Sequence, residues 1–333
     1  MKKFFIFTLF ALFSLSASAQ FFKKFDNFWS KRFNRVVYDT NYISRPQNAK
    51  WGLRFSIPFT WSTLSTSGSY NGTDFSTKTS SDITPKVKIA ASYYGLTIGF
   101  GINTKKIFAK DERDLELRIN AYGKRMGFQL EFHQVQTLEG TLKIEDVDIT
   151  IPKEFVTYGH FYFDFYYVFN NKHFSHPAAF NQSFIQKRSA GSILGGLSFN
   201  IMTLDVGDSI QQTDIFRVQS VTLGLGVGYG YNFVLPHRWL VHISALPYLA
   251  ISGRNSFRIS EIDENGDEVY IETSNSTGFP EAFVLGKFSA VRWLNERWYA
   301  GMMVLFDYSN IKTTYTAVYT KNWQASAYVG IRW

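Results

Sequence analysis

The sequence predicts an all-β fold: an antiparallel transmembrane outer-membrane β-barrel of about twelve strands (ten to fourteen), preceded by a short N-terminal amphipathic helical segment. Apolar and polar side chains alternate with a period of two along many runs, as they do from Trp51 to Trp61 and from Val221 to Phe233. The connections between these runs are alternately long and short, which is how an outer-membrane barrel is connected. No segment after the N-terminus is typical of a transmembrane helix.

The composition excludes several classes of protein. The 333 residues include 33 Phe, 19 Tyr and 8 Trp, far too many aromatic residues for a disordered chain. No cysteine is present, which excludes disulfide scaffolds, thiolate zinc sites, cysteine nucleophiles, iron–sulfur clusters and a lipoprotein anchor. The net charge of +8 is modest for this length and gives no argument for nucleic acid as a partner.

Residues 1–19 are predicted to be a signal peptide. Lys2 and Lys3 precede a twelve-residue apolar core over 4–15, and Ala17-Ser18-Ala19 is an A-x-A cleavage site. The core is too short for an ordinary membrane-spanning helix. We therefore expect an exported protein of the cell envelope.

Residues 20–49 are predicted to form a periplasmic amphipathic segment. Phe21, Phe25, Phe28 and Phe33 recur at helical spacing, and lysine and arginine residues occupy the other side. Three roles are open: a short helix that caps the barrel, a plug of the lumen, or a helix lying on the inner leaflet of the membrane.

Residues 50–333 are assigned to the barrel. A soluble β-sandwich would also alternate, but here the apolar face repeatedly ends in aromatic residues, as at membrane interfaces, and the opposite face is polar or charged. The chain also ends on Trp333, which resembles the terminal signal that the barrel insertion machinery recognises. The expected strands lie near 50–61, 86–93, 95–103, 114–122, 126–134, 156–170, 188–202, 215–234, 238–252, 280–293, 297–309 and 317–333, and the expected outer loops near 62–85, 135–155 and 253–279.

One connection, residues 170–187, breaks the pattern because it is long on the side where turns are short. The sequence favours an ordinary ordered periplasmic loop here, and the alternative is an inward-folded constriction or a partner contact. This region also carries a family resemblance, together with Tyr38–Ile43. The segments Phe174–Ser183 and Gln186–Ser192 resemble an uncharacterised family of Bacteroides-type outer-membrane β-barrels, a domain of unknown function. The resemblance extends from about residue 36 to the end and includes Phe174, Pro177, Ala178, Ala179, Gln182, Gln186, Ser189 and Gly191. It implies an outer-membrane barrel and no established activity.

The face opposite the aromatic residues carries charges of both signs. If the aromatic faces meet lipid, the lumen holds Arg54, Lys86, Lys88, Arg118, Glu131, His133, Asp164 and His242. The favoured interpretation is a salt-bridge network that fills a narrow barrel. The alternative is a set of charges that confers selectivity on a conducting pore.

Enzymatic chemistry and metal binding find little support. No G-x-S-x-G elbow, P-loop or dinucleotide fingerprint occurs, and His242 followed by Ser244 is a chance-level pairing on one strand face. His173 and His176 lie in a proline-containing loop without an evident third ligand. We predict no cofactor, no metal and no catalytic residue.

The leading functional prediction is a porin-like passive pore, or a small-solute channel or transporter, in the outer membrane of a Gram-negative bacterium. The alternative is a structural or interaction barrel with a filled lumen and partner-binding outer loops. A lipid-modifying enzyme, such as a hydrolase or acyltransferase, ranks third. The expected partners are outer-membrane lipids, the barrel insertion machinery through the C-terminal strand, and small solutes, with no nucleic acid.

Overall fold

The computed structural model describes residues 19–35, 37–46, 50–70, 72–103, 115–208, 213–262, 268–276, 282–313 and 315–333. The chain divides into two units, residues 1–37 and 38–333. The predicted signal peptide, apart from Ala19, lies outside the described residues and remains a prediction. The described part of the first unit contains the helix α2 (Ala19–Asn34), on which Phe28 is 52% exposed. Among the described helices, none is both long and apolar enough to cross a membrane.

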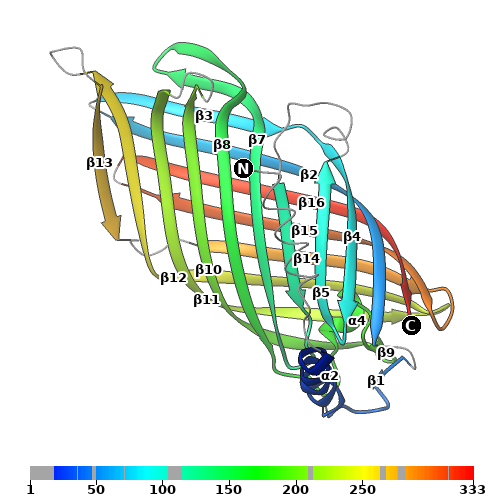
Figure 1. The fold of residues 1–333 in the computed structure, drawn as a ribbon. Coiled ribbons are helices and arrows are strands. Elements are labelled where there is room, and N and C mark those ends of the chain that lie inside the picture. Colours follow the sequence, from blue (N-terminus) through cyan, green and yellow to red (C-terminus); the bar gives the residue numbers. More distant parts are fainter. Residues whose placement is uncertain are drawn as a thin grey trace. The chain divides into compact units, whose positions relative to one another are not determined.

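The second unit is a closed antiparallel β-barrel, which confirms the predicted fold class (Figure 1). Twelve of the described strands follow one another around the ring, and the last, β16, pairs with the first, β2, so that the ring has no free edge. In ring order they are β2 (Trp51–Tyr70), β4 (Thr84–Tyr93), β5 (Leu96–Asn103), β6 (Leu115–Ala121), β7 (Met126–Ile144), β8 (Val147–Val168), β10 (Ala190–Asp208), β11 (Thr213–Leu235), β12 (Trp239–Ile262), β14 (Ala282–Trp293), β15 (Trp298–Lys312) and β16 (Thr316–Arg332).

The two ends of the barrel differ. Short connections gather at one end, here named the turn end, where β4 passes to β5 through Tyr94 and Gly95. Both of these residues have positive φ, 46° and 88°, as a tight two-residue hairpin requires, and glycine meets that requirement without strain. The other end, here named the hairpin end, carries the long hairpins formed by β2 with β3 (Thr73–Ser81), β7 with β8, and β12 with β13 (Glu268–Ser276).

These hairpins correct the prediction of outer loops near 62–85, 135–155 and 253–279, because most of those residues continue the strands. Apolar and polar side chains still alternate there, but the apolar side chains point into the barrel instead of outward. Nearer the turn end, apolar side chains of β10 such as Ile193 (53% exposed) and Leu197 (39%) point outward, whereas Leu204 further along the same strand is fully buried inside. Polar and charged outer faces therefore indicate strands that leave lipid for water.

The exterior near the turn end forms a continuous apolar belt. Exposed apolar and aromatic side chains on β2 occupy the odd positions that the sequence assigned to lipid, from Trp51 (45% exposed) to Trp61 (42%). Neighbouring strands add side chains of the same kind, including Ile89, Phe100, Val227, Tyr229, Ile243, Met302 and Trp323. Such a belt on a closed barrel is the surface that a bilayer covers.

The inside of the hairpin end is an apolar cluster, here named the roof. It consists of buried side chains from β2, β7, β8, β10, β11, β12, β15 and β16, among them Leu64, Val135, Leu138, Val156, Leu204, Val218, Phe257 and Val318. A cluster of this kind resembles the core of a soluble barrel. It fills the lumen on the hairpin-end side of the belt.

Candidate functional site

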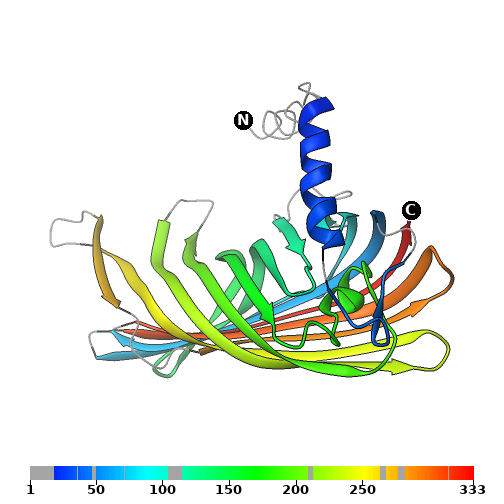
Figure 2. The ribbon, with the colours of Figure 1, turned by 90° about the horizontal axis from the view of Figure 1, so that it is seen from below.

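The connection between β8 and β10 folds back into the barrel, where residues 174–184 are all buried (Figure 2). We name residues 174–186 the plug. The sequence favoured an ordinary periplasmic loop for this connection, and the structure corrects that prediction. The plug contains a one-turn helix, α4 (His176–Phe180), which begins at the cap Ser175, whose hydroxyl accepts a hydrogen bond from the Ala178 backbone N–H at 3.3 Å.

Side chains from around the ring hold the carbonyl groups of the plug. Ser289 Oγ on β14 donates to the Ala179 carbonyl at 3.0 Å, and Arg54 on β2 donates to the Phe180 carbonyl at 2.8 Å. The next carbonyl, of Asn181, accepts from Arg332 on β16. These carbonyls lie at the C-terminal end of α4, where backbone acceptors lack partners within the helix and favour cations.

A second anchor connects the plug to β11 and β12. Asn232 donates to the Ser175 carbonyl at 2.9 Å and to the Gln186 side chain at 3.0 Å, and its Oδ1 lies 2.7 Å from His242 Nδ1. The other ring nitrogen of His242 lies 2.9 Å from Ser244 Oγ. Asn232 and His242 are fully buried, so the serine, histidine and asparagine form one sealed hydrogen-bonded chain.

Aromatic rings complete the seat of the plug. Phe180 stacks on Tyr122 with ring centroids 5.4 Å apart, and it meets His242 edge-on at 4.9 Å. Gly224, Gly226, Gly228 and Gly230 form a glycine row on β11 that makes room for such rings. A Cβ atom at Gly226 would lie 2.7 Å from the Tyr248 ring, which is closer than such contacts allow. The glycine row therefore accommodates aromatic side chains.

The plug is also tied to the segment that precedes the barrel. β1 (Ile43–Ser44) pairs with β9 (Ile185–Gln186), and the Asp39 backbone N–H donates to the Lys172 carbonyl. The Asn41 backbone N–H donates to the Asp39 carboxylate at 2.8 Å, and this bond lowers the pKa of Asp39. We name residues 38–46 the strap.

On the hairpin-end side of the plug, polar side chains form hydrogen bonds and an ion pair across the lumen. Arg118 on β6 forms an ion pair with Glu131 on β7 at 2.5 Å, and it also donates to Gln324 on β16 at 2.6 Å. Lys287 on β14 donates to Gln129 on β7 at 3.2 Å. Since β6 and β16, like β7 and β14, lie far apart around the ring, these bonds span the interior. They favour the filled network that the sequence predicted.

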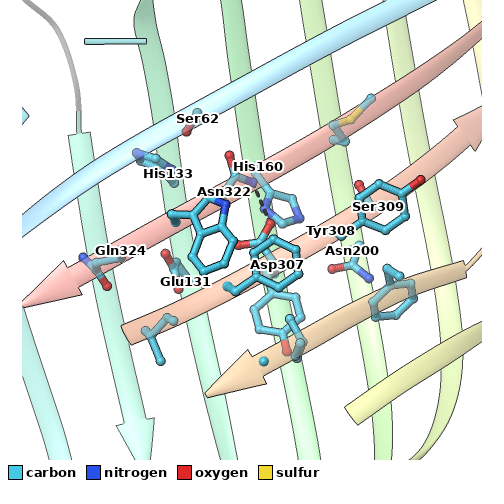
Figure 3. Close-up of a pocket in the computed structure, with 18 of the residues that line it drawn as sticks. Ser62, Glu131, His133, His160, Asn200, Asp307, Tyr308, Ser309, Asn322 and Gln324 are labelled. Carbon is cyan, nitrogen blue, oxygen red and sulfur yellow. Dashed lines mark hydrogen bonds between the residues drawn. The ribbon is translucent and has the colours of Figure 1, made fainter. Parts of the chain in front are cut away.

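A cavity of about 100 Å³ lies between this network and the roof (Figure 3). Glu131, His133, His160 and Asn200 line it, together with Asp307, whose carboxylate accepts a hydrogen bond from Asn322 at 2.6 Å. This volume accommodates several water molecules or a small polar solute. Among the described residues, no group of three or more His, Asp or Glu is arranged to hold a metal ion.

The structure places the predicted lumen residues on the inner face. Lys86, Lys88, Arg118, Asp164 and His242 are all buried there. Arg54, Glu131 and His133 are partly buried and face the plug or the cavities. Asp164 accepts a hydrogen bond from the Tyr248 hydroxyl across the lumen.

The family-like residues gather around the plug. Phe174, Pro177, Ala178, Ala179, Gln182 and Gln186 belong to it and are buried. Ser189 is exposed, and its hydroxyl accepts from the Val234 backbone N–H at 2.9 Å. Gly191 lies against the Tyr229 ring, where a Cβ atom has no room.

Sequence reasoning missed several residues of the site. Lys287, Ser289 and Asp307 lie on the two runs, 280–293 and 297–309, whose alternation is poor, so their inward direction had no clear signal. Tyr122, at the end of the run 114–122, stacks on Phe180, and Asn181 within the plug donates to the Gly95 carbonyl at 2.8 Å; strand periodicity gave no signal for either contact.

Fold and site together define a membrane-type β-barrel whose lumen is occupied by its own polypeptide. The chain belongs to the family described as a domain of unknown function (DUF4421), whose model matches residues 37–333. This confirms the resemblance drawn from the sequence. Comparison with curated proteins found no match.

Several solved outer-membrane barrels are similar in fold. The outer membrane protease OmpT from Escherichia coli is 7% identical, with 90% of this chain and 99% of that chain covered and a TM-score of 0.43. The translocator domain of the autotransporter NalP from Neisseria meningitidis is 11% identical, with 86% and 90% covered and a TM-score of 0.36. OprG from Pseudomonas aeruginosa is 11% identical, with 86% and 98% covered and a TM-score of 0.29. A likeness at these identities concerns the fold alone.

Proposed function

We propose that the protein is an outer-membrane barrel with a closed lumen, which acts as a structural or interaction protein through its hairpin end. The observation that carries this proposal is the plug, whose residues 174–184 are buried inside the ring and bonded to it from β2, β11, β14 and β16. The network across the lumen and the roof also support the proposal, because both fill the lumen between the plug and the hairpin end.

The orientation follows from the connections. Outer-membrane barrels place short turns in the periplasm and long connections outside the cell. The turn end, with the plug and the strap, then faces the periplasm of a Gram-negative bacterium, and the hairpins extend to the outside of the cell. In this proposal the apolar belt contacts outer-membrane lipids, and the strand ending at Trp333 engages the insertion machinery.

The hairpin of β7 and β8 is the surface that we expect a partner to use. Val147 (60% exposed) and Ile149 (44%) lie near its tip, and Glu145, Asp146 and Asp148 beside them are exposed acidic residues. Because β7 and β8 extend past the roof, these apolar side chains face water and not lipid. An apolar pair rimmed by acids fits a partner that carries apolar and basic groups.

We further propose that the protein is not an enzyme. The Ser244–His242–Asn232 chain has the order of a nucleophile, a base and an orienting group. All three side chains are buried beneath the plug, however, and Phe180 packs on the imidazole ring. Asn232 binds the plug directly, which supports a role for this chain as an anchor.

The decisive experiment is single-channel conductance of the refolded mature chain in a planar bilayer. We expect no steady conductance from the full chain, because the plug, the network and the roof occupy the lumen. Replacing residues 175–184 by a glycine–serine linker of equal length removes the plug, and adding Leu204→Ser and Phe257→Ser loosens the roof. This combined variant is expected to conduct, because the plug is removed, the roof is loosened and only the polar network remains in the lumen.

A variant that shortens the β7–β8 tip by removing residues 144–147 is the matched control, and it should stay silent. Heat-modifiable gel mobility confirms that each variant has folded. Steady conductance from the full chain would overturn the closed-lumen proposal and support the passive pore that the sequence favoured.

A further inference from the structure

The turn end of the barrel is strongly basic. The connections β6–β7, β8–β10, β11–β12 and β14–β15 span residues 122–125, 169–189, 236–238 and 294–297. Together they contain seven lysine or arginine residues and one acidic residue, Glu296. A surface with this balance of charge attracts anions, and the place where its cations gather indicates which anion they bind.

Three exposed arginine residues gather on two adjacent hairpins of this end. Arg238 lies in the β11–β12 turn, Arg292 near the end of β14, and Arg297 in the β14–β15 turn. β12 pairs with β14, with Trp239 opposite Arg292, so the two hairpins lie side by side (Figure 2). The Arg238 carbonyl also accepts a hydrogen bond from the Trp293 backbone N–H at 3.2 Å. We name Arg238, Arg292 and Arg297 the arginine cluster.

The guanidinium groups of the cluster have few partners in the protein. Arg292 lies over the Trp239 ring, 5.9 Å from its centroid. Within the described part of the chain, none of the three side chains forms an ion pair or a hydrogen bond. Their donors are therefore available to a ligand, and the planar fork of a guanidinium group matches the oxygens of a phosphate.

The backbone of the β11–β12 turn indicates that the Arg238 side chain has a use. His237 and Arg238 have φ angles of 60° and 64°, in the left-handed region. Glycine and asparagine adopt this conformation with less strain than other residues. An arginine held in a strained turn is a reason to expect a function for its side chain.

Apolar side chains of the belt border the cluster. Leu235, Trp239, Leu294 and Trp298 lie in or beside the same two turns and are all exposed. Tryptophan is enriched where a membrane meets water, with its ring at the depth of the lipid headgroups. Cations at that depth lie close to the phosphates of the lipids.

We propose that the arginine cluster binds the headgroup of an anionic phospholipid. The guanidinium groups hold the phosphate, and the acyl chains lie along the apolar belt. Because the two turns hold three arginines and one acidic residue, they favour a lipid with net negative charge, such as phosphatidylglycerol, over phosphatidylcholine, whose choline group is cationic. The inference rests on the proposed contact of the belt with outer-membrane lipids, and it holds whether or not the lumen conducts.

Native mass spectrometry of the refolded mature chain, released from detergent with equal amounts of phosphatidylglycerol and phosphatidylcholine, measures which lipid stays bound. We expect the natural chain to retain phosphatidylglycerol in preference by about fivefold or more, and this preference to fall as the salt concentration rises. Equal retention of the two lipids would overturn the proposal, leave the belt as a lipid contact, and point to an acidic protein as the partner of the arginines. Retention of neither lipid would contradict both the cluster and the belt.

Variants locate the site. Arg292→Gln/Arg297→Gln should lose most of the preference for the anionic lipid. Lys78→Gln/Lys143→Gln is the matched control, because it removes the same charge from exposed positions of the hairpin end, and it should keep the natural preference. Equal loss in the two variants would indicate an effect of net charge and would contradict the site. If the first variant fails to fold, Arg238→Asn decides: asparagine tolerates the positive φ of that turn, and an unchanged lipid preference there would overturn the cluster.

Discussion

At the scale of single residues, one lysine at the turn end is buried although lysine side chains are ordinarily charged and exposed. Lys124, in the connection between β6 and β7, is 2% exposed, and its ammonium lies 4.6 Å from the centre of the Tyr38 ring in the strap. Burial, and to a lesser extent the nearby Arg45 guanidinium, together lower the pKa of Lys124 from its ordinary 10.5 to about 7. The strap therefore rests against a lysine that titrates near neutrality.

This predicts a pH-dependent stability. Between about pH 7 and 10.5 the unfolded chain binds more protons at Lys124 than the folded chain, so the free energy of unfolding should rise with pH across that window. Urea unfolding in detergent at several pH values measures the slope. Lys124→Met should flatten it, and the exposed Lys172→Met is the control that should leave it unchanged. An equal slope in Lys124→Met would contradict the lowered pKa.

The sequence located inner-facing residues well where alternation was clean. Arg54, Lys88, Arg118 and Asp164 were all assigned to the lumen from strand periodicity, and all face inward. What periodicity cannot supply is the partner, because partners such as Arg118 and Gln324 are 206 residues apart and meet only once the ring has closed.

Among the elements, the plug and the strap form one unit held by strand pairing. β1 and β9 pair, the Lys187 backbone N–H donates to the Tyr42 carbonyl at 2.6 Å, and His173 lies 3.4 Å from the Asp39 carboxylate. The sequence predicted no element here, because residues 170–187 show neither a strand nor a helix period. Their conformation depends on the tertiary contacts that bury them.

Removing the strap should loosen the plug. A mature chain that starts at residue 47 lacks these contacts, so amide hydrogen exchange across residues 174–186 should become faster. A chain that starts at residue 37 keeps the strap and lacks only α2, and its exchange in the plug should match that of the full chain. Faster exchange in both truncations would mean that α2, and not the strap, supports the plug.

At the scale of the whole molecule, apolar side chains point outward near the turn end of a strand and inward near its hairpin end. We therefore expect mutations at the two ends to lower the free energy of unfolding by different amounts. Leu204 belongs to the roof and is fully buried, whereas Ile193 on the same strand is 53% exposed on the lipid-facing side. Leu204→Ala leaves a cavity in a packed core and should cost about 2–5 kcal/mol of unfolding free energy. Ile193→Ala should cost less, because lipid chains can fill the space.

Unfolding of both variants refolded in lipid vesicles tests this difference. Equal costs would show that the roof is not packed as a core. The ring of twelve strands could be predicted from period and connection length, but the roof could not. The segments that form it are rich in Ser and Thr or in charged residues, so they looked like loops. The apolar side chains were expected to point outward along the whole strand, as in a membrane strand, whereas in the roof they point inward.

The two arginines that bind neighbouring plug carbonyls also bear on the order of assembly. Arg54 lies on the first strand of the ring, 126 residues before Phe180, and Arg332 lies on the last, 151 residues after Asn181. The seam between β2 and β16 joins the most distant parts of the barrel, so its closure carries the largest loss of chain entropy. A plug already seated on β11 and β12 presents adjacent acceptors to both strands. The middle of the chain can thus act as an internal template on which its two ends meet.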